Sequence, residues 1–140
     1  MSPDFPHIIC ITEHHMNSNE INFSKFDNYN LGAQFCRENN SKGGVAIYIH
    51  NSLKFSPTDL YKYSKEKDIE IIGVKLQVNS IIVYIITIYR SPSGNFNYFL
   101  QTLDKILQYI NSHNVHIIIC GDINVNYLIE NNQIHIMYIL

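Results

Sequence analysis

Two runs rich in β-branched residues in this chain each stop at an acidic residue. The first run, Ile8-Ile9-Cys10-Ile11-Thr12, ends at Glu13, and the second, Ile117-Ile118-Ile119-Cys120-Gly121, ends at Asp122. Such runs are typical of strands that are buried on both faces of a sheet. We therefore expect each strand to carry its carboxylate from a dry core to the edge of a sheet, where open α/β folds place their chemistry.

The composition fits one domain. The chain has 140 residues, and 46% of them are hydrophobic, which is enough for a real core but too little chain for two domains. Charged residues make up 16% and the formal net charge is −2, so charge alone does not indicate a protein that binds nucleic acid through a broad basic surface. No apolar stretch reaches the roughly 20 residues that cross a bilayer, so we expect no membrane partner.

The three cysteines indicate a reducing compartment. Cys10, Cys36 and Cys120 are odd in number and have no metal-ligand spacing, so we interpret them as small buried hydrophobic residues. The first residues also lack the basic segment of a secretory signal. We expect an intracellular protein, with the nucleus as one option, and not a secreted one; the sequence does not predict its oligomeric state.

Hydrophobic periodicity predicts further elements. Gly43-Gly44 opens a short strand over 45–49, and residues 69–78 alternate as a half-exposed strand does. A turn at Asn79-Ser80 joins the latter to residues 81–89, which are apolar on both parities and predict the central strand of an antiparallel hairpin. From Phe96 to Ile110 apolar residues recur at three- and four-residue steps, which predicts an amphipathic helix capped by Asn95. The polar segments 17–42 and 56–68 predict loops, and residues 134–140 a fragment of one more element.

Four segments, in this order, resemble a known family. They are Ile9-Cys10-Ile11-Thr12-Glu13, Gly43-Gly44-Val45-Ala46-Ile47-Tyr48, Ile88-Tyr89-Arg90-Ser91-Pro92-Ser93-Gly94-Asn95 and Cys120-Gly121-Asp122-Ile123-Asn124-Val125. Together they resemble the endonuclease/exonuclease/phosphatase superfamily. The version that they resemble most is the endonuclease domain that precedes reverse transcriptase in non-LTR (LINE-like) retrotransposons. Each segment alone is weak, but the set is specific.

The resemblance implies an α/β (α+β) fold in which two mainly antiparallel sheets pack face to face and helices flank them. We expect residues 1–140 to form a single, incomplete domain of this kind, truncated at both ends. The family has an Asn-bearing strand before the Glu13 segment and a Ser-Asp-His motif after the Asp122 segment. His135 has no Ser-Asp before it, so it is not assigned to that motif.

The resemblance also implies roles for five residues. Glu13 matches the ligand of a catalytic Mg²⁺ (or Mn²⁺), and an acid that ends a strand is a suitable hard-oxygen ligand. Tyr89 matches a tyrosine whose hydroxyl faces the scissile phosphate, and Arg90 follows it as a cationic contact to DNA phosphate. Asp122 matches the residue that orients or deprotonates the attacking water, and Asn124 the amide that holds the phosphate. In an extended chain these last two side chains, two residues apart, point the same way.

The resemblance implies hydrolysis of a phosphodiester, with DNA as the substrate. The reaction needs a metal, a base near the water and donors to the phosphate oxygens, and the chain supplies only part of this set. We therefore expect weak or absent activity. Two alternatives stay open: a phosphatase of the same superfamily, and a non-catalytic remnant that at most binds a partner. His14-His15 could suggest a transition-metal site, but adjacent strand residues face opposite ways, so surface positions are favoured.

Overall fold

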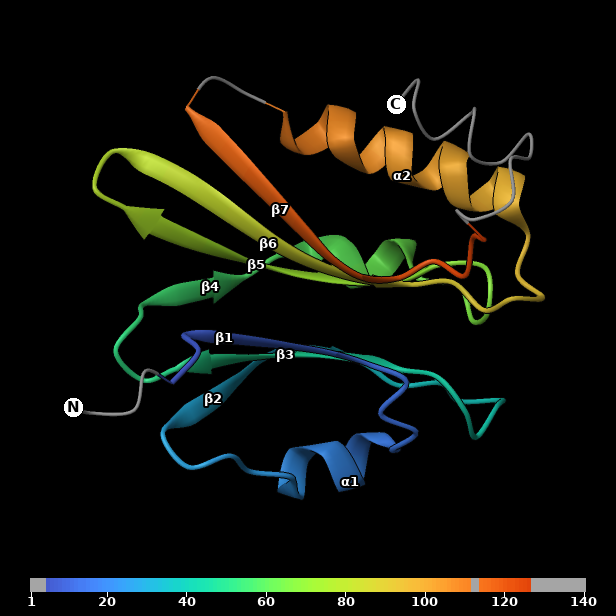
Figure 1. Ribbon diagram of the computed structural model, residues 1–140, viewed down its shortest axis with the longest axis horizontal. Helices are drawn as coiled ribbons and strands as arrows, with labels where there is room; N and C mark the ends of the chain where they lie inside the picture. Colours follow the sequence, from blue (N-terminus) through green and yellow to red (C-terminus); the bar gives the residue numbers. More distant parts are fainter. Residues whose placement is uncertain (1–4, 112–113, 127–140) are drawn as a thin grey trace.

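The computed structural model describes residues 5–111 and 114–126, and in this part of the chain two β-sheets pack face to face (Figure 1). One sheet has the strand order β1-β3-β2 and the other β4-β5-β6-β7. Helix α1 lies outside the first sheet and α2 outside the second. The predicted α+β sandwich of mainly antiparallel strands is therefore confirmed. Residues 134–140, where a further element was expected, lie outside the described residues, as does His135.

The first sheet is antiparallel throughout, with its most buried strand in the centre. Strand β3 (Val45–His50) pairs with β1 (Ile8–Thr12) on one side and with β2 (Tyr29–Phe35) on the other. Helix α1 (Ser18–Phe23) covers the outer face, into which it buries Ile21. The helix begins where the Asn17 side chain accepts hydrogen bonds from two backbone N–H groups. The Glu20 carboxylate in turn accepts from the Asn17 N–H, which completes a capping box.

The second sheet contains the predicted hairpin. Strands β5 (Glu70–Val78) and β6 (Ile81–Tyr89) pair antiparallel across Asn79-Ser80, and the short β4 (Phe55–Pro57) flanks β5. Helix α2 (Phe96–Ile110), capped by Asn95 as predicted, crosses over to β7 (Val115–Asp122), which runs parallel to β6. A parallel pair needs such a crossover because the chain must return to the starting edge. The apolar face of α2 packs on Ile71, Ile86 and Ile88.

Three layers of apolar side chains hold these elements. The layer between the sheets is built from the inner faces of β3, β5 and β6, for example Ile47, Val74 and Ile85. The other two layers lie under α1 and under α2. No helix in the described ranges is long and apolar enough to span a membrane.

Several expectations from the sequence were wrong in detail. Strand β5, expected to be half-exposed, is buried from Glu70 to Val74, and the three cysteines are only partly buried. Strands β1 and β7 are not buried on both faces: each has a neighbouring strand on one side only among the described residues, and Ile118 and Ile119 are 49% and 43% exposed. Segment 17–42 is not mostly loop, because it holds α1 and β2, and segment 56–68 holds the end of β4 and a 3-10 helix, Asp59–Tyr63. Pairing with β3 makes a strand of a segment whose own pattern is weak.

Candidate active site

Three strands end at one edge of the sandwich and bring the predicted residues together (Figure 1, right-hand side). Tyr89, the last residue of β6, pairs in register with Asp122, the last residue of β7. Strand β1 lies against both strands, since the Cys10 thiol adjoins the side chains of Thr87 and Cys120. Glu13 directly follows β1, and its carboxylate lies near enough to the Tyr89 side chain for Tyr89 to lower the pKa of Glu13; both residues line one hollow. Glu13 and Asp122 are therefore both neighbours of Tyr89.

The Glu13 carboxylate is held as an anion at this edge. It is 44% exposed, and its Oε2 lies 3.4 Å from His15 Nε2. The hydrogen bond from Tyr89 is the main cause that lowers the pKa of Glu13 below its usual value, and His15 adds to the effect. Conversely, burial and then the bond to Glu13 raise the pKa of Tyr89, so its hydroxyl keeps its proton. Both side chains line a hollow of about 310 Å³.

Asp122 and Asn124 meet through a turn and not through strand alternation. Strand β7 ends at Asp122, and Asn124 has a φ of +51°, so the extended geometry assumed from the sequence does not apply. The Asn124 N–H donates to Asp122 Oδ1 at 2.8 Å, and the Asn124 side-chain amide donates to the Arg90 carbonyl at 2.8 Å. Asp122 stays exposed, and both residues line a hollow of about 380 Å³.

Gly121 allows β7 to come this close to β6. Its φ is +140°, and a Cβ at this position would lie 1.8 Å from the Ile88 carbonyl oxygen. Any side chain would therefore push Asp122 away from Tyr89.

Arg90 lies below the site and not on its surface. It is 3% exposed, and its guanidinium donates to the carbonyls of Ile123, Gly94 and Asn124 at 2.8 to 2.9 Å. This placement does not support the predicted contact between Arg90 and DNA phosphate, because its donors are taken up by the backbone. Arg90 instead holds the 123–124 turn against the loop that follows β6.

A buried ion pair, which was missed from the sequence, supports the site. Glu70 is fully buried and accepts hydrogen bonds from Arg37 Nε at 2.6 Å and from the Gly44 N–H at 2.7 Å. The Arg37 guanidinium lies 5.8 Å from the centre of the Tyr89 ring. One signal could have revealed the pair: Glu70 has the same parity as Ile72 and Val74, so it is an acid on the buried face of its strand.

The histidines after Glu13 have different surroundings. His14 is half-buried, and its ring bonds to the Phe35 carbonyl at 3.1 Å and accepts from the Met16 N–H at 3.0 Å. With both ring nitrogens bonded to backbone, His14 has a structural place, whereas His15 is exposed beside Glu13. The described residues contain no cluster of three or more His, Cys, Asp or Glu side chains around one point.

The residues present nevertheless fit a hard divalent cation. Mg²⁺ is usually held by one or two carboxylates, together with water and substrate phosphate oxygens. Glu13 offers an ionised, half-exposed carboxylate, and the exposed Asp122 is the strand partner of Tyr89. A full cage of protein ligands is not needed for this ion.

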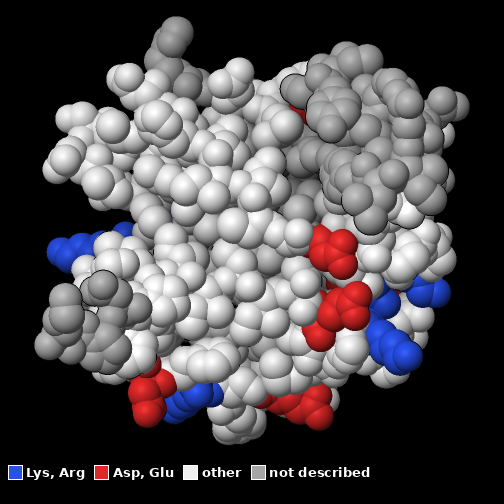
Figure 2. All heavy atoms as spheres, in the orientation of Figure 1, with Lys and Arg blue, Asp and Glu red and all other residues white. Residues whose placement is uncertain are grey.

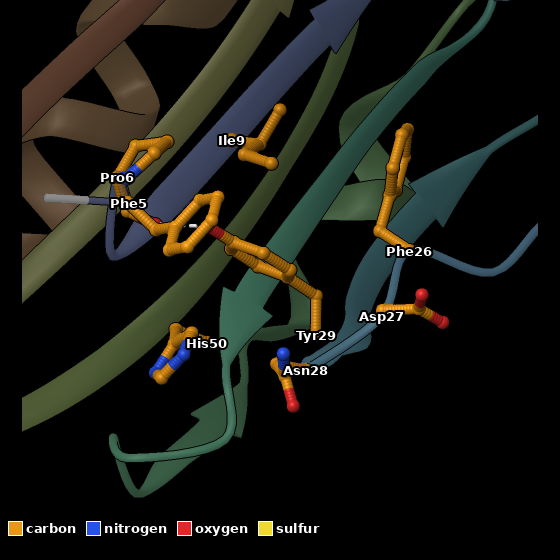
Figure 3. A pocket seen from close by; sticks show the side chains of 8 residues that line it. All are labelled: Phe5, Pro6, Ile9, Phe26, Asp27, Asn28, Tyr29 and His50. Atoms are coloured by element: carbon orange, nitrogen blue, oxygen red, sulfur yellow. Dashed lines mark hydrogen bonds between the residues drawn. The ribbon is translucent and has the colours of Figure 1, made fainter. Parts of the chain in front are cut away.

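Another hollow, of about 490 Å³, lies near the opposite end of β1 (Figure 3). It is lined by aromatic side chains, including Phe5, Tyr29 and His50, and the Tyr29 hydroxyl donates to the Pro6 carbonyl. Ile9 lines it too, and four residues of strand, roughly 13 Å, separate Ile9 from Glu13. This hollow is therefore separate from the predicted site.

Solved structures with a similar fold include nucleic-acid enzymes. The endonuclease domain of TRAS1, a telomere-specific non-LTR retrotransposon, matches with a TM-score of 0.57 and 13% identity over 74% of this chain and 44% of that domain. TDP2 of D. rerio, humanized by 14 mutations, matches with a TM-score of 0.62 and 12% identity over 94% and 56% of the two chains. D. rerio TDP2 complexed with a single strand DNA product matches with 0.61 and 12% over 95% and 52%. The chain spans about half the length of these structures.

At these identities the likeness shows the fold, and the family comes from the sequence itself. No curated protein is significantly similar to the chain. The pattern of the Endonuclease/Exonuclease/phosphatase family, however, matches residues 2–130, which is nearly the whole sequence. The chain therefore belongs to the endonuclease/exonuclease/phosphatase family, as its four sequence segments predicted.

Proposed function

We propose that this chain is part of a divalent-metal-dependent DNA endonuclease of the non-LTR retrotransposon type. One observation carries the proposal: the Tyr89 side chain shares a hollow with an ionised Glu13, and the strand partner of Tyr89 is Asp122. Two carboxylates at one strand edge match what phosphodiester hydrolysis requires, a metal ligand and a group that acts on water. The similarity to the TRAS1 endonuclease domain and to TDP2 with a DNA product supports DNA as the substrate class.

Each residue then has a separate task. Glu13 would hold Mg²⁺ (or Mn²⁺), which when bound would supply positive charge against the phosphate. Tyr89 orients the Glu13 carboxylate and presents its hydroxyl to the same hollow. Asp122, whose Oδ1 is fixed by the Asn124 N–H, orients the attacking water and accepts its proton. Asn124 is oriented by the bond from its side-chain amide to the Arg90 carbonyl, and the second N–H of that amide contacts a phosphate oxygen.

We further propose that this chain alone turns over slowly. No histidine in its sequence follows the Ser-Asp pattern of the motif that the family has after the Asp122 segment. The alternative is a non-catalytic remnant that at most binds a partner or nucleic acid. Metal binding separates the two, because a remnant without a working site has no need of Glu13.

Nicking of supercoiled plasmid tests the function. We expect slow nicking that requires Mg²⁺ or Mn²⁺ and that falls by about 10²-fold or more in Asp122→Asn, the loss typical of a removed general base. Asp59→Asn is the matched control, because Asp59 is exposed and lines neither hollow of the site. Equal nicking by Asp122→Asn and the unchanged chain would refute the assigned roles.

Metal titration completes the test. Binding of Mn²⁺ is measured from the electron paramagnetic resonance spectrum of the free ion. We expect the affinity for Mn²⁺ to fall in Glu13→Gln and to be unchanged in Asp59→Asn. If no binding depends on Glu13 or Asp122, the non-catalytic alternative holds. Rapid turnover, of the order of 1 s⁻¹ or faster, would contradict the slow-turnover proposal.

A further inference from the structure

The hollow that contains Glu13 and Tyr89 has a rim of cations. Arg37, Lys42 and Lys67 line it, and Glu13 is the one carboxylate among its lining residues. These residues come from three places in the sequence that the fold brings together at the site edge. Figure 2 shows acidic and basic side chains side by side on this edge of the molecule.

The two lysines of the rim lack a partner. Lys62 and Lys65 each bind a nearby aspartate, Asp59 and Asp68, at 2.8 and 2.7 Å. Within the described residues, no carboxylate lies within salt-bridge distance of Lys42 or Lys67, and both side chains are exposed. Their charges are therefore free to meet an anion.

The backbone that carries Lys67 is fixed on both sides. Lys67 has a φ of +70°, its N–H donates to the buried Glu70 carboxylate at 3.2 Å, and its carbonyl accepts from the Ser91 N–H at 2.9 Å. Gly94 packs so closely that a Cβ there would lie 2.1 Å from the Lys67 oxygen. This loop is therefore joined to the loop that follows Tyr89.

The backbone next to Lys42 is fixed in a similar way. The Glu66 carboxylate accepts from the N–H groups of Glu38 and Asn39 at 2.6 and 2.9 Å, which ties the 37–40 segment to the Lys67 loop. At the other side of Lys42, Gly43 has a φ of +102° and lies against the Arg37 guanidinium, where a Cβ would be 2.3 Å away. Both lysines thus project from anchored segments.

Arg37 adds a third, buried cation. Its side chain is 5% exposed, and its Nη2 contacts Glu70 yet donates no well-directed hydrogen bond to any described residue. Arg90, which was expected to meet phosphate, is committed to three carbonyls. Positive charge at the site edge therefore comes from the rim.

We propose that Lys42 and Lys67 form a binding site for backbone phosphates of a DNA strand that enters the Glu13 hollow. This inference rests on the proposed nuclease function for the identity of the ligand. The two lysines contact phosphates that flank the reacting one, and Arg37, paired with the buried Glu70, fixes the base of the hollow between them. The rim thus sets how the strand lies across Glu13 and Tyr89.

Binding without metal tests this site independently of catalysis. A fluorescent single-stranded oligonucleotide is titrated in EDTA, followed by anisotropy, at several salt concentrations. Each lost phosphate contact lowers the slope of log K against log salt by about 0.7 for single strands, so the double variant Lys42→Gln/Lys67→Gln should lose about 1.4. Referred to 1 M salt, that change weakens binding about 25-fold at 0.1 M.

The controls separate this site from general charge. Lys54→Gln/Lys105→Gln removes the same charge from two exposed, unpaired lysines that do not line the hollow, and should change the slope by less than about 0.3. An oligonucleotide with uncharged methylphosphonate linkages should bind both double variants and the unchanged chain equally. Arg37 is not substituted in these variants, because its removal would leave the buried Glu70 carboxylate without a counterion.

Each outcome has one meaning. Equal losses in the two double variants, or no loss in Lys42→Gln/Lys67→Gln, would overturn the phosphate site. Absence of any oligonucleotide binding by the unchanged chain would overturn it as well. If the rim behaves as expected while Asp122→Asn nicks plasmid as the unchanged chain does, the phosphate site holds and the catalytic proposal alone fails.

Discussion

Replacing Glu70 with Gln should show how strongly the buried ion pair supports the site. The Glu70 carboxylate is fully buried and accepts three hydrogen bonds, from Arg37 Nε, the Gly44 N–H and the Lys67 N–H. A glutamine keeps one acceptor oxygen, but its NH₂ group faces a donor where the second oxygen was. It also leaves the charge of Arg37 buried without a counterion.

The expected cost follows from these contacts. Breaking a buried ion pair by removing one partner costs about 3 to 5 kcal/mol, because the remaining charge is uncompensated. A domain of this size is stable by only about 5 to 15 kcal/mol, so Glu70→Gln should remove a large part of the total. By contrast, Asp59→Asn breaks only the exposed pair with Lys62, so its free energy of unfolding should stay close to that of the unchanged chain.

Urea unfolding followed by circular dichroism measures both variants. A free energy of unfolding for Glu70→Gln within 0.5 kcal/mol of that for Asp59→Asn, a margin roughly the error of such measurements, would refute the reasoning. If Glu70→Gln does not fold, the double variant Arg37→Met/Glu70→Leu is compared with Arg37→Met instead. The double variant removes both charges of the buried pair, so it should have a higher free energy of unfolding than Arg37→Met, which leaves the Glu70 charge uncompensated.

Three further predictions concern the site edge. Arg90→Lys should lower the free energy of unfolding by about 2 to 4 kcal/mol in thermal melts, because an ammonium cannot reach all three carbonyls; unchanged stability would contradict the structural role of Arg90. Tyr89→Phe should raise the pKa of Glu13 toward its usual value, measured by NMR titration of the carboxyl carbon. Since the folded-state pKa of Glu13 is depressed, its contribution to stability is present above about pH 4.5 and is lost as the pH falls through the folded pKa. In Tyr89→Phe this fall in stability at acid pH should be smaller. Ile118→Thr, on the exposed strand β7, should reduce self-association measured by light scattering and change the free energy of unfolding by less than about 1 kcal/mol. Equal self-association of the variant and the unchanged chain would show that the protein does not associate through β7.

Local patterns in the sequence were sufficient for several elements. The hairpin at Asn79-Ser80 and helix α2 with its Asn95 cap follow from residues close to one another in the chain. The same holds for the two acids at strand ends, since Glu13 directly follows β1 and Asp122 closes β7. The family resemblance then predicted the sandwich, because its motifs lie in a shared order.

The tertiary structure decided which strands are edges and which charges are free. Strands β1 and β7 read as fully buried, but their exposure depends on how many strands lie beside them, which no local pattern encodes. Arg90 was predicted to contact phosphate, but two of the carbonyls to which it donates lie 33 and 34 residues later in the chain. Arg37 likewise pairs with Glu70, which lies 33 residues away in the sequence. Short-range periodicity arises from backbone geometry within each element, whereas the partners of a buried charge are chosen only when distant segments pack together.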